Sequence, residues 1–270
     1  MLLDRGVRRQ IEKHGVECLF EEVKSTFQTS DAVIINLECP ITDTLSPVNK
    51  RYIFRADSEW TPALRKAGIT HAALANNHSY DQGRSGLKNT ACHLQQFGIT
   101  PLGYGENQTT ACHPVFISKK GIEVAIFNSV LLPLENWVYL EDQPGVCQAT
   151  ADDLAMQIRS MKSENPACYV VVVLHWGVEY QLQPTIRQRR DAYCLIDAGA
   201  DAIVGHHPHV VQEEELYQSK PVFYSLGNFV FDPVHPEAKK GRLLQLIFDE
   251  NGVSYHAKEI IIKDGKPGFD

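Results

Sequence analysis

The stretch "CYVVVVLHW", residues 168–176, carries the strongest fold signal in this 270-residue sequence. Its four valines and one leucine form an unbroken apolar run, which is typical of a short strand buried on both faces of a sheet. The run ends at His175, where an imidazole interrupts the apolar surface. An unpaired polar group costs about 1–3 kcal/mol when it is buried, so His175 needs a partner. A backbone carbonyl or a bound metal ion could fill that role.

Strand-like and helix-like segments alternate on either side of this run. Further strand-like runs are "AVIINLE", "HAALANNH" and "ADAIVG", and helical spacing of apolar residues recurs at residues 11–27, 58–67, 84–97, 149–163 and 185–198. This alternation favours an α/β fold. We expect a single domain over residues 1–270 with a β-rich segment at about residues 221–263. In that segment "VFYSLGNFVFD" is predicted to be strand, and Asn251-Gly252 is predicted to mark a tight hairpin.

Polar side chains follow the predicted strands at the point where each strand ends. They are Glu38, Asn77 with His78, His175, and the histidines of residues 206–209. Ligands of α/β sheets bind at the carboxyl ends of the strands, so we expect these side chains to lie close together.

The last of these groups lies in "VGHHPHVVQ", residues 204–212. In an extended segment alternate side chains face the same way, so His207 and His209 would project together and His206 would face elsewhere. Pro208 would stiffen the backbone between them. Such a pair could hold a metal ion, and it could equally be a surface pair or a pair with partners in the core. His175 nearby favours a shared metal ion.

The residues at the ends of the two earlier strands add other donor types. A carboxylate such as Glu38 can bridge cations, Asn77 offers an amide oxygen, and the imidazole of His78 can carry a proton near neutral pH. A turn at Asn76-Asn77 and a solvated strand end at Glu38 are the simpler alternatives. A donor set of mixed oxygen and nitrogen atoms suits one or two ions of Mn, Fe or Zn better than Mg or Ca.

Charge and hydropathy exclude some functional classes. The formal net charge of -7 argues against nucleic-acid binding, which needs clustered lysine and arginine. The N-terminal segment is charged from Asp4 onward, and the longest strongly apolar run, residues 169–174, is too short to cross a bilayer. The sequence as it stands therefore predicts a soluble, cytoplasmic protein without a transmembrane segment, which a longer native N-terminus could change.

The chain has seven cysteines, and no two of them are spaced as C-x-x-C. A disulfide framework or a zinc knuckle would show a different pattern. Cys168 and Cys194 lie in apolar patterns, so we expect the cysteines to be buried free thiols in a reducing compartment.

Five blocks in a fixed order carry a resemblance to a known family. They are "NLECPIT", "LANNHSYDQG", "LHWGVEY", "LIDAGADAIVGHHPHVVQ" and "FYSLGNFVFD". The chain resembles, over about residues 3–232, the CapA family of capsule and poly-γ-glutamate synthesis proteins, which is similar to calcineurin-like metallophosphoesterases. The resemblance implies a calcineurin-like sandwich of two β-sheets flanked by helices. It also implies a metal-dependent hydrolase of phosphoesterase type that acts on an anionic small molecule or polymer.

The resemblance also implies roles for individual residues. Glu38 matches the metal-bridging carboxylate, and His78 matches the histidine that protonates the leaving group. The other metal ligands implied are Asn77, His175, His207 and His209. Less specific matches are Arg51 and Arg55 for an anionic substrate, with surface ion pairs as the alternative, and Asp81, Glu179 and Asn228 as groups that orient the ligands.

One part of the family pattern is missing. CapA-like proteins usually open with a strand that ends in Gly-Asp and supplies a first metal ligand, and Asp4 comes too late to replace it. Either the start is placed too far downstream, which we favour, or the chain is naturally shortened and binds one metal ion weakly or none. The alternatives to a phosphoesterase are a noncatalytic polymer-binding or scaffold protein that retains a relic metal site and a metal-dependent amide hydrolase.

Overall fold

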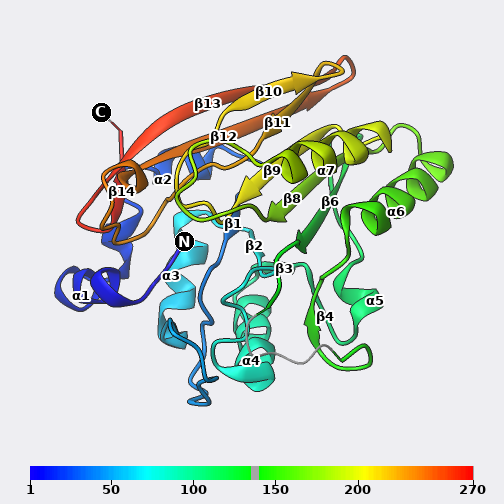
Figure 1. The fold of residues 1–270 in the computed structure, drawn as a ribbon. Helices are drawn as coiled ribbons and strands as arrows, with labels where there is room; N and C mark the ends of the chain where they lie inside the picture. The colour runs from blue at the N-terminus through cyan, green and yellow to red at the C-terminus, as the bar shows by residue number, and fades with distance from the viewer. Residues whose placement is uncertain (135–139, 270) are drawn as a thin grey trace.

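A computed structural model describes residues 1–134 and 140–269 of the chain. The apolar run in "CYVVVVLHW" forms β8 (Tyr169–His175), an inner strand of a six-stranded sheet (Figure 1). The strand order in this sheet is β10-β11-β9-β8-β6-β5, and β6, β8, β9 and β11 run parallel. The other members of the sheet are β5 (Val115–Lys119), β6 (Ile122–Val130), β9 (Ala202–His206), β10 (Glu214–Tyr217) and β11 (Lys220–Phe223).

Three smaller sheets complete the β-structure. A parallel sheet has the order β1-β2-β3, an antiparallel sheet the order β12-β13-β14, and two short strands pair as β4 and β7. Their bounds are β1 (Ile34–Asn36), β2 (His71–Ala73), β3 (Thr100–Leu102), β4 (Tyr104–Gly105), β7 (Gly145–Val146), β12 (Lys240–Asp249), β13 (Gly252–Lys263) and β14 (Lys266–Gly268).

Helices lie between and outside these strands. The α-helices are α1 (Arg5–His14), α2 (Lys24–Gln28), α3 (Thr61–Ala67), α4 (Gly83–Gln96), α5 (Gln108–Ala111), α6 (Ala151–Glu164) and α7 (Ile186–Asp197). Short 3-10 helices are η1 (Val16–Leu19), η2 (Ser58–Trp60) and η3 (Glu237–Lys239). None of the helices in the described residues has the length and apolar character needed to cross a membrane.

The alternation of side chains along β8 explains the layers. Val170 and Val172 pack in one core cluster with residues of α6 and α7, on the side where Figure 1 shows these two helices. Val171 and Val173 belong to a second cluster with residues of β2, β3 and β12. Both faces of β8 are therefore buried, as its continuous apolar run predicts.

A third core cluster lies on the other face of the β1–β3 sheet. Ile35 and Ala72 of this sheet pack there with Leu64 of α3 and Leu87 of α4. The layers are thus helices, the β1–β3 sheet, the six-stranded sheet, and helices again. The predicted α/β class is confirmed.

Two of the predicted elements differ from the observed ones in a way that changes the course of the chain. The helix predicted at residues 11–27 is interrupted at Gly15, which has a φ of 80° and ends α1, and the chain continues through η1 into α2. The stretch "VFYSLGNFVFD" is strand only up to Phe223, and the chain then leaves the sheet until β12 begins. The hairpin predicted at Asn251-Gly252 is confirmed, because β12 pairs with β13 up to Asp249 opposite Gly252.

The expectation that all cysteines are free thiols is wrong. Cys112 and Cys147 form a disulfide, with their Cα atoms 4.8 Å apart. They meet because Cys112 directly follows α5, which contacts β4 and β7, and Cys147 directly follows β7, where its N–H donates to the carbonyl of Gly103 at 2.9 Å. Cys168 is a buried free thiol as expected, whereas Cys194 is half-buried.

Candidate metal centre

The predicted ligand residues come together at the carboxyl ends of strands from two sheets. β1 and β2 lead to Glu38 and Asn77, whereas β8 ends at His175 and β9 leads to His207 and His209. These strands are parallel to their neighbours, so each sheet presents its carboxyl ends at one edge, and the two edges meet.

The Glu38 carboxylate lies at the middle of the cluster. Its Oε1 atom is 3.6 Å from Nε2 of His175 and 3.5 Å from Nε2 of His209. Glu38, His175 and His207 each offer a ligand atom within 4.8 Å of the others. The amide oxygen Oδ1 of Asn77 is 2.9 Å from Nε2 of His175. The Glu38 carboxylate could therefore bind an ion together with His175 and also together with His209.

These separations fit the chemistry of a divalent ion. Ligand atoms about 2.1 Å from a shared ion are roughly 3.0–3.4 Å apart at octahedral or tetrahedral angles. The distances between Asn77, His175 and Glu38 are close to those edges. In the described part of the chain, Oε1 of Glu38 and Nδ1 of His207 are buried atoms without a hydrogen-bond partner. An ion would give such atoms the partner that buried polar groups require.

Burial sets the protonation of these groups. Burial lowers the pKa of His175 well below its usual value and that of His207 to about 4. Burial alone would raise the pKa of Glu38, but the imidazoles of His209 and His175 beside it hold that pKa well below its usual range. Near neutral pH the Glu38 carboxylate is therefore charged and the imidazoles of His175 and His207 are neutral, which are the forms that bind metal ions.

Asn228 orients His209 through a contact at Nδ1, the ring nitrogen that does not face Glu38. Nδ1 of His209 is 2.9 Å from the amide oxygen of Asn228, whose Nδ2 donates to the carbonyls of His209 and Ala238 at 3.0 Å. Because the amide oxygen of Asn228 can only accept, His209 donates a hydrogen bond from Nδ1, and its Nε2 lies on the side of Glu38.

His78 is fixed by a buried carboxylate. Nδ1 of His78 is 2.8 Å from Oδ2 of Asp81, whose side chain is only 1% exposed. The backbone N–H of His78 donates to Oδ1 of Asn76 at 3.0 Å, and the ring of Phe54 packs against the imidazole with centroids 4.5 Å apart. These contacts leave Nε2 of His78 without a protein hydrogen bond within the described residues.

The backbone around the final histidine pair differs from the prediction. β9 ends at His206, and His207 and His209 have φ angles of 100° and 58°, so this segment is a turn and not extended chain. The prediction that His207 and His209 share one face of an extended segment is therefore wrong. The two imidazoles still lie near each other, with ring centroids 6.2 Å apart, because the turn brings them together.

The weaker matches lie in different surroundings. The guanidinium of Arg55 contacts Asp57 at 2.6 Å and donates to the carbonyl of Thr42 at 2.9 Å, so it is already engaged. Arg51 is exposed, with its guanidinium over the ring of Tyr52 at 5.1 Å from the centroid. Glu179 is exposed on the loop that follows β8.

Three residues near the cluster were missed by the sequence reasoning. Asn76 donates to the carbonyl of Leu37 at 2.8 Å, and the buried Lys50 contacts Asp81 at 2.9 Å. Tyr180 places its ring 6.1 Å from that of His209. Asn76 lies in the block "LANNHSYDQG" and Tyr180 in the block "LHWGVEY", so the family resemblance could have pointed to both residues. Nothing in "NKRYIF" distinguishes the buried side chain of Lys50 from the exposed arginine beside it.

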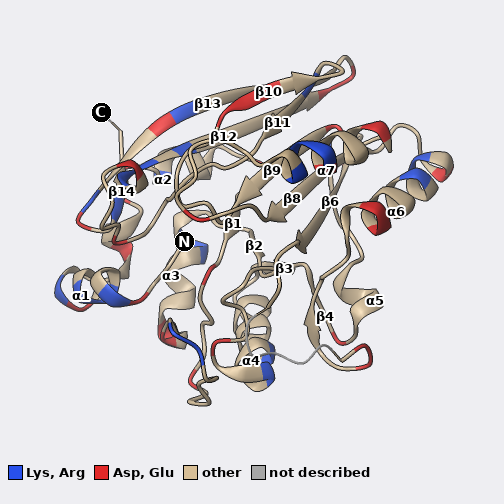
Figure 2. Cartoon of the chain, viewed as in Figure 1, with Lys and Arg blue, Asp and Glu red and all other residues tan. Residues whose placement is uncertain are grey.

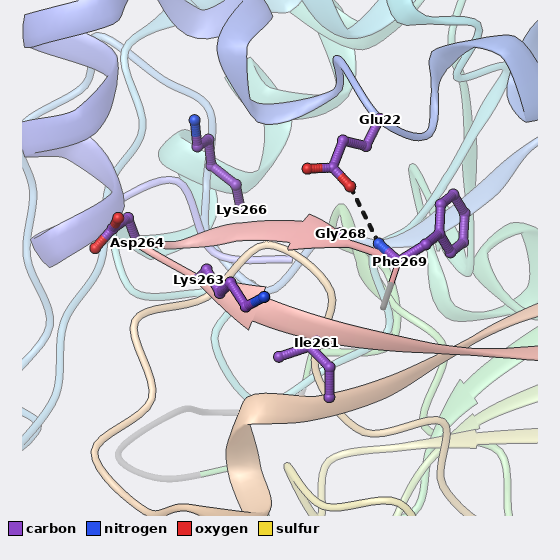
Figure 3. A pocket seen from close by; sticks show the side chains of 7 residues that line it. All are labelled: Glu22, Ile261, Lys263, Asp264, Lys266, Gly268 and Phe269. Atoms are coloured by element: carbon purple, nitrogen blue, oxygen red, sulfur yellow. Dashed lines mark hydrogen bonds between the residues drawn. The ribbon is translucent and has the colours of Figure 1, made fainter.

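Two cavities in the described part of the molecule lie away from this cluster. A cavity of about 240 Å³ lies between β13, β14 and Glu22, whose carboxylate accepts from the N–H of Phe269 at 3.1 Å (Figure 3). A second cavity, of about 360 Å³, lies beside α6 and β5. Neither is lined by a candidate ligand. Figure 2 shows basic and acidic segments interspersed, with both on α6 and on β13.

Comparison with known proteins gives matches over most of the chain. Residues 1–233 match the family described as bacterial capsule synthesis protein PGA_cap. The capsule biosynthesis protein CapA of Bacillus anthracis is 33% identical over 274 aligned residues, which cover 99% of this chain and 67% of that protein. The PGA biosynthesis protein CapA of Bacillus subtilis (strain 168) is 31% identical over 271 residues, which cover 99% of this chain and 71% of that protein.

A solved structure is similar in fold. A putative 5'-nucleotidase from Staphylococcus aureus, in complex with alpha-ketoglutarate, superposes with a TM-score of 0.50 at 18% identity and covers 78% of this chain and 41% of that one. This likeness concerns the fold alone, and it confirms the predicted sandwich of β-sheets flanked by helices.

Proposed function

The chain belongs to the bacterial capsule synthesis protein family PGA_cap, and from this premise we propose that it is a metal-dependent hydrolase of phosphoesterase type. Its place in capsule or poly-γ-glutamate biosynthesis follows from the family. The observation that supports the hydrolase is the meeting of Glu38, Asn77, His175, His207 and His209 at one place. Two buried atoms of this cluster, Oε1 of Glu38 and Nδ1 of His207, have no hydrogen-bond partner among the described residues.

The five side chains would hold one or two divalent ions. Mixed carboxylate, amide and imidazole donors favour Mn, Fe or Zn. A bound ion would polarise a phosphoryl oxygen and lower the pKa of water. Asn77 and His207 are only half-buried, so the cluster has a side that a substrate can reach, whereas Glu38 and His175 are buried beneath it.

His78 is the proton donor in this proposal. Asp81 accepts a hydrogen bond from Nδ1–H and thereby orients the ring. With a proton on each ring nitrogen, His78 would pass the Nε2 proton to the departing oxygen as its bond to phosphorus breaks. The ring would then be the neutral Nδ1–H tautomer, still hydrogen-bonded to Asp81. The names of the relatives point to an anionic polymer as the substrate class, and the exposed Arg51 is the arginine that could meet it.

The test is hydrolysis of bis-p-nitrophenyl phosphate with added Mn²⁺. We expect His207→Ala to lower the rate at least about 100-fold, because it removes a ligand from the ion that provides the catalytic charge. His256→Ala, which changes an exposed histidine of β13, is the matched control and should leave the rate unchanged.

Equal turnover by the wild type and His207→Ala would show that another site is responsible. A wild type that binds no stoichiometric ion and hydrolyses no ester would instead favour the noncatalytic polymer-binding protein. Cleavage of a γ-glutamyl amide without cleavage of the ester would favour the amide hydrolase.

A further inference from the structure

Lys50 is a buried lysine beside the proposed proton donor. Its side chain is 5% exposed, and it belongs to the irregular segment before η2. Its Nζ atom donates to the carbonyl of Asn77 at 2.7 Å and to Oδ1 of Asp81 at 2.9 Å, and it lies 3.3 Å from Nδ1 of His78. The first two contacts are hydrogen bonds from the ammonium to oxygen acceptors. The third is a close approach, because Oδ2 of Asp81, which can only accept, lies nearer to Nδ1 of His78 at 2.8 Å and takes its N–H.

The carboxylate of Asp81 depends on this lysine. Its Oδ2 accepts from the N–H of Phe54 at 2.8 Å and contacts Nδ1 of His78, which leaves Oδ1 to Lys50. Asp81 is 1% exposed, and a buried carboxylate that loses its cationic partner is strongly destabilised. Without Lys50 the carboxylate would turn toward water or take up a proton, and either change would remove the acceptor behind His78.

The same ammonium also holds the main chain beside a candidate ligand. The carbonyl that it binds belongs to Asn77, whose side-chain oxygen is 2.9 Å from Nε2 of His175. One side chain from a distant part of the sequence therefore contacts both the residue that would bind the ion and the carboxylate that orients the proton donor.

We propose that Lys50 is a positioning residue that keeps His78 in its Nδ1–H tautomer, through Asp81, and sets it relative to the amide oxygen of Asn77. The kinetic consequence rests on the proposed phosphoesterase function. The effect on the tautomer rests on the contacts of Lys50 and Asp81 alone.

The chain offers a matched control. Nζ of Lys162 donates to the carbonyl of Cys168 at 2.7 Å and to the buried carboxylate of Asp201 at 3.0 Å. These are the same two kinds of bond, made at the start of β8, whereas the candidate metal centre lies at its end. Lys162→Met therefore measures the general effect of losing such a lysine.

The experiment compares two phosphodiesters in the presence of Mn²⁺. Bis-p-nitrophenyl phosphate has a leaving group that departs without a proton, whereas diphenyl phosphate has a more basic one. We expect Lys50→Met to lower kcat on diphenyl phosphate about 100-fold and on the nitrophenyl ester at most about tenfold, because only the first ester needs the proton donor. Lys162→Met should leave the ratio of the two rates unchanged, and Lys50→Arg should restore part of it.

A second measurement needs no catalysis. Nitrogen-15 NMR of the metal-free protein, with the His78 signals assigned from His78→Ala, should show one Nδ1–H tautomer in the wild type and in Lys162→Met. Lys50→Met should show a mixture of tautomers. If Lys50→Met is too unstable to study, the double variant Lys50→Met/Asp81→Asn removes the unpaired charge and should fold, still with the altered ratio of rates and the mixed tautomers.

An unchanged tautomer together with equal losses on both esters would overturn the proposal and leave Lys50 a structural residue. Hydrolysis of neither ester by the wild type would refute the phosphoesterase function, and the NMR comparison would then decide on Lys50 by itself.

Discussion

Three of the four imidazoles in and beside the candidate centre are placed by a side-chain contact that the residue type alone does not reveal. His209 meets Asn228 at Nδ1, His78 meets Asp81 at Nδ1, and His175 meets Asn77 at Nε2. His207 is held by burial and by its turn, and in the described residues its Nδ1 has no hydrogen-bond partner. The cluster is therefore a set of oriented imidazoles around one buried carboxylate.

The low pKa of His207 predicts how the metal-free protein responds to acid. Burial holds this pKa at about 4, below the value of about 6.5 expected for the unfolded chain. Between these values the unfolded state binds the extra proton, so the free energy of unfolding should fall as pH decreases from about 6.5 to about 4, by up to roughly 3 kcal/mol for this residue. Urea unfolding of chelator-treated protein at a series of pH values measures this effect.

His207→Gln is the comparison for that series, because it cannot take up a proton. The slope between pH 4 and 6.5 should be smaller in this variant than in the wild type. An identical slope would mean that the imidazole of His207 is solvated and titrates normally.

At the scale of single elements, the local pattern of apolar residues predicted the helices and strands whose formation depends on that pattern. The apolar run of β8 and the helical spacing of α4, α6 and α7 gave elements within two residues of the predicted ends. The predicted helix at residues 11–27 failed at Gly15, whose positive φ ends a helix at little steric cost. The stretch after β11 is rich in β-forming residues, yet Gly227 and Asn228 leave the sheet to meet β12 and His209.

The bond between Cys112 and Cys147 gives a prediction at this scale. It closes a loop over a sequence separation of 35 residues, and such a crosslink stabilises a protein by about 3–4 kcal/mol, mainly by restricting the unfolded chain. We expect Cys147→Ser to lower the midpoint of thermal unfolding clearly. The mass of the unreduced wild type should be lower by two hydrogens than that of the reduced protein.

Cys92→Ser is the control for this change, because Cys92 is an exposed free thiol. It should leave the midpoint near that of the wild type. Wild-type protein whose mass and midpoint do not respond to reduction would count against the bond.

At the scale of the whole molecule, the candidate centre joins two sheets that no hydrogen-bonded strand pairing connects among the described residues. Glu38 and Asn77 come from the β1–β3 sheet, whereas the three histidines come from the six-stranded sheet. The two sheets share a core of Ala73, Leu102, Val171 and Val173, and their carboxyl edges meet above it. An ion bound at this edge would link both halves of the sandwich.

Binding of an ion to the folded state alone should therefore stabilise the whole chain. Mn²⁺ at about 100 times its dissociation constant would raise the free energy of unfolding by about 2.7 kcal/mol. A thermal shift titration measures this change, and His207→Ala should show a much smaller shift than His256→Ala. Equal shifts for the two variants would place the bound ion away from the cluster.

The sequence by itself determined the α/β class, the central strand and the set of polar residues at strand ends, because hydrophobic periodicity and strand-end positions are local properties of the chain. It also carried the family, through blocks such as "LANNHSYDQG". Only the tertiary structure decided that Lys50 is buried against Asp81, that Cys112 meets Cys147, and that a turn brings His207 and His209 to Glu38. Those contacts join residues far apart in the chain, and their geometry depends on how the two sheets pack.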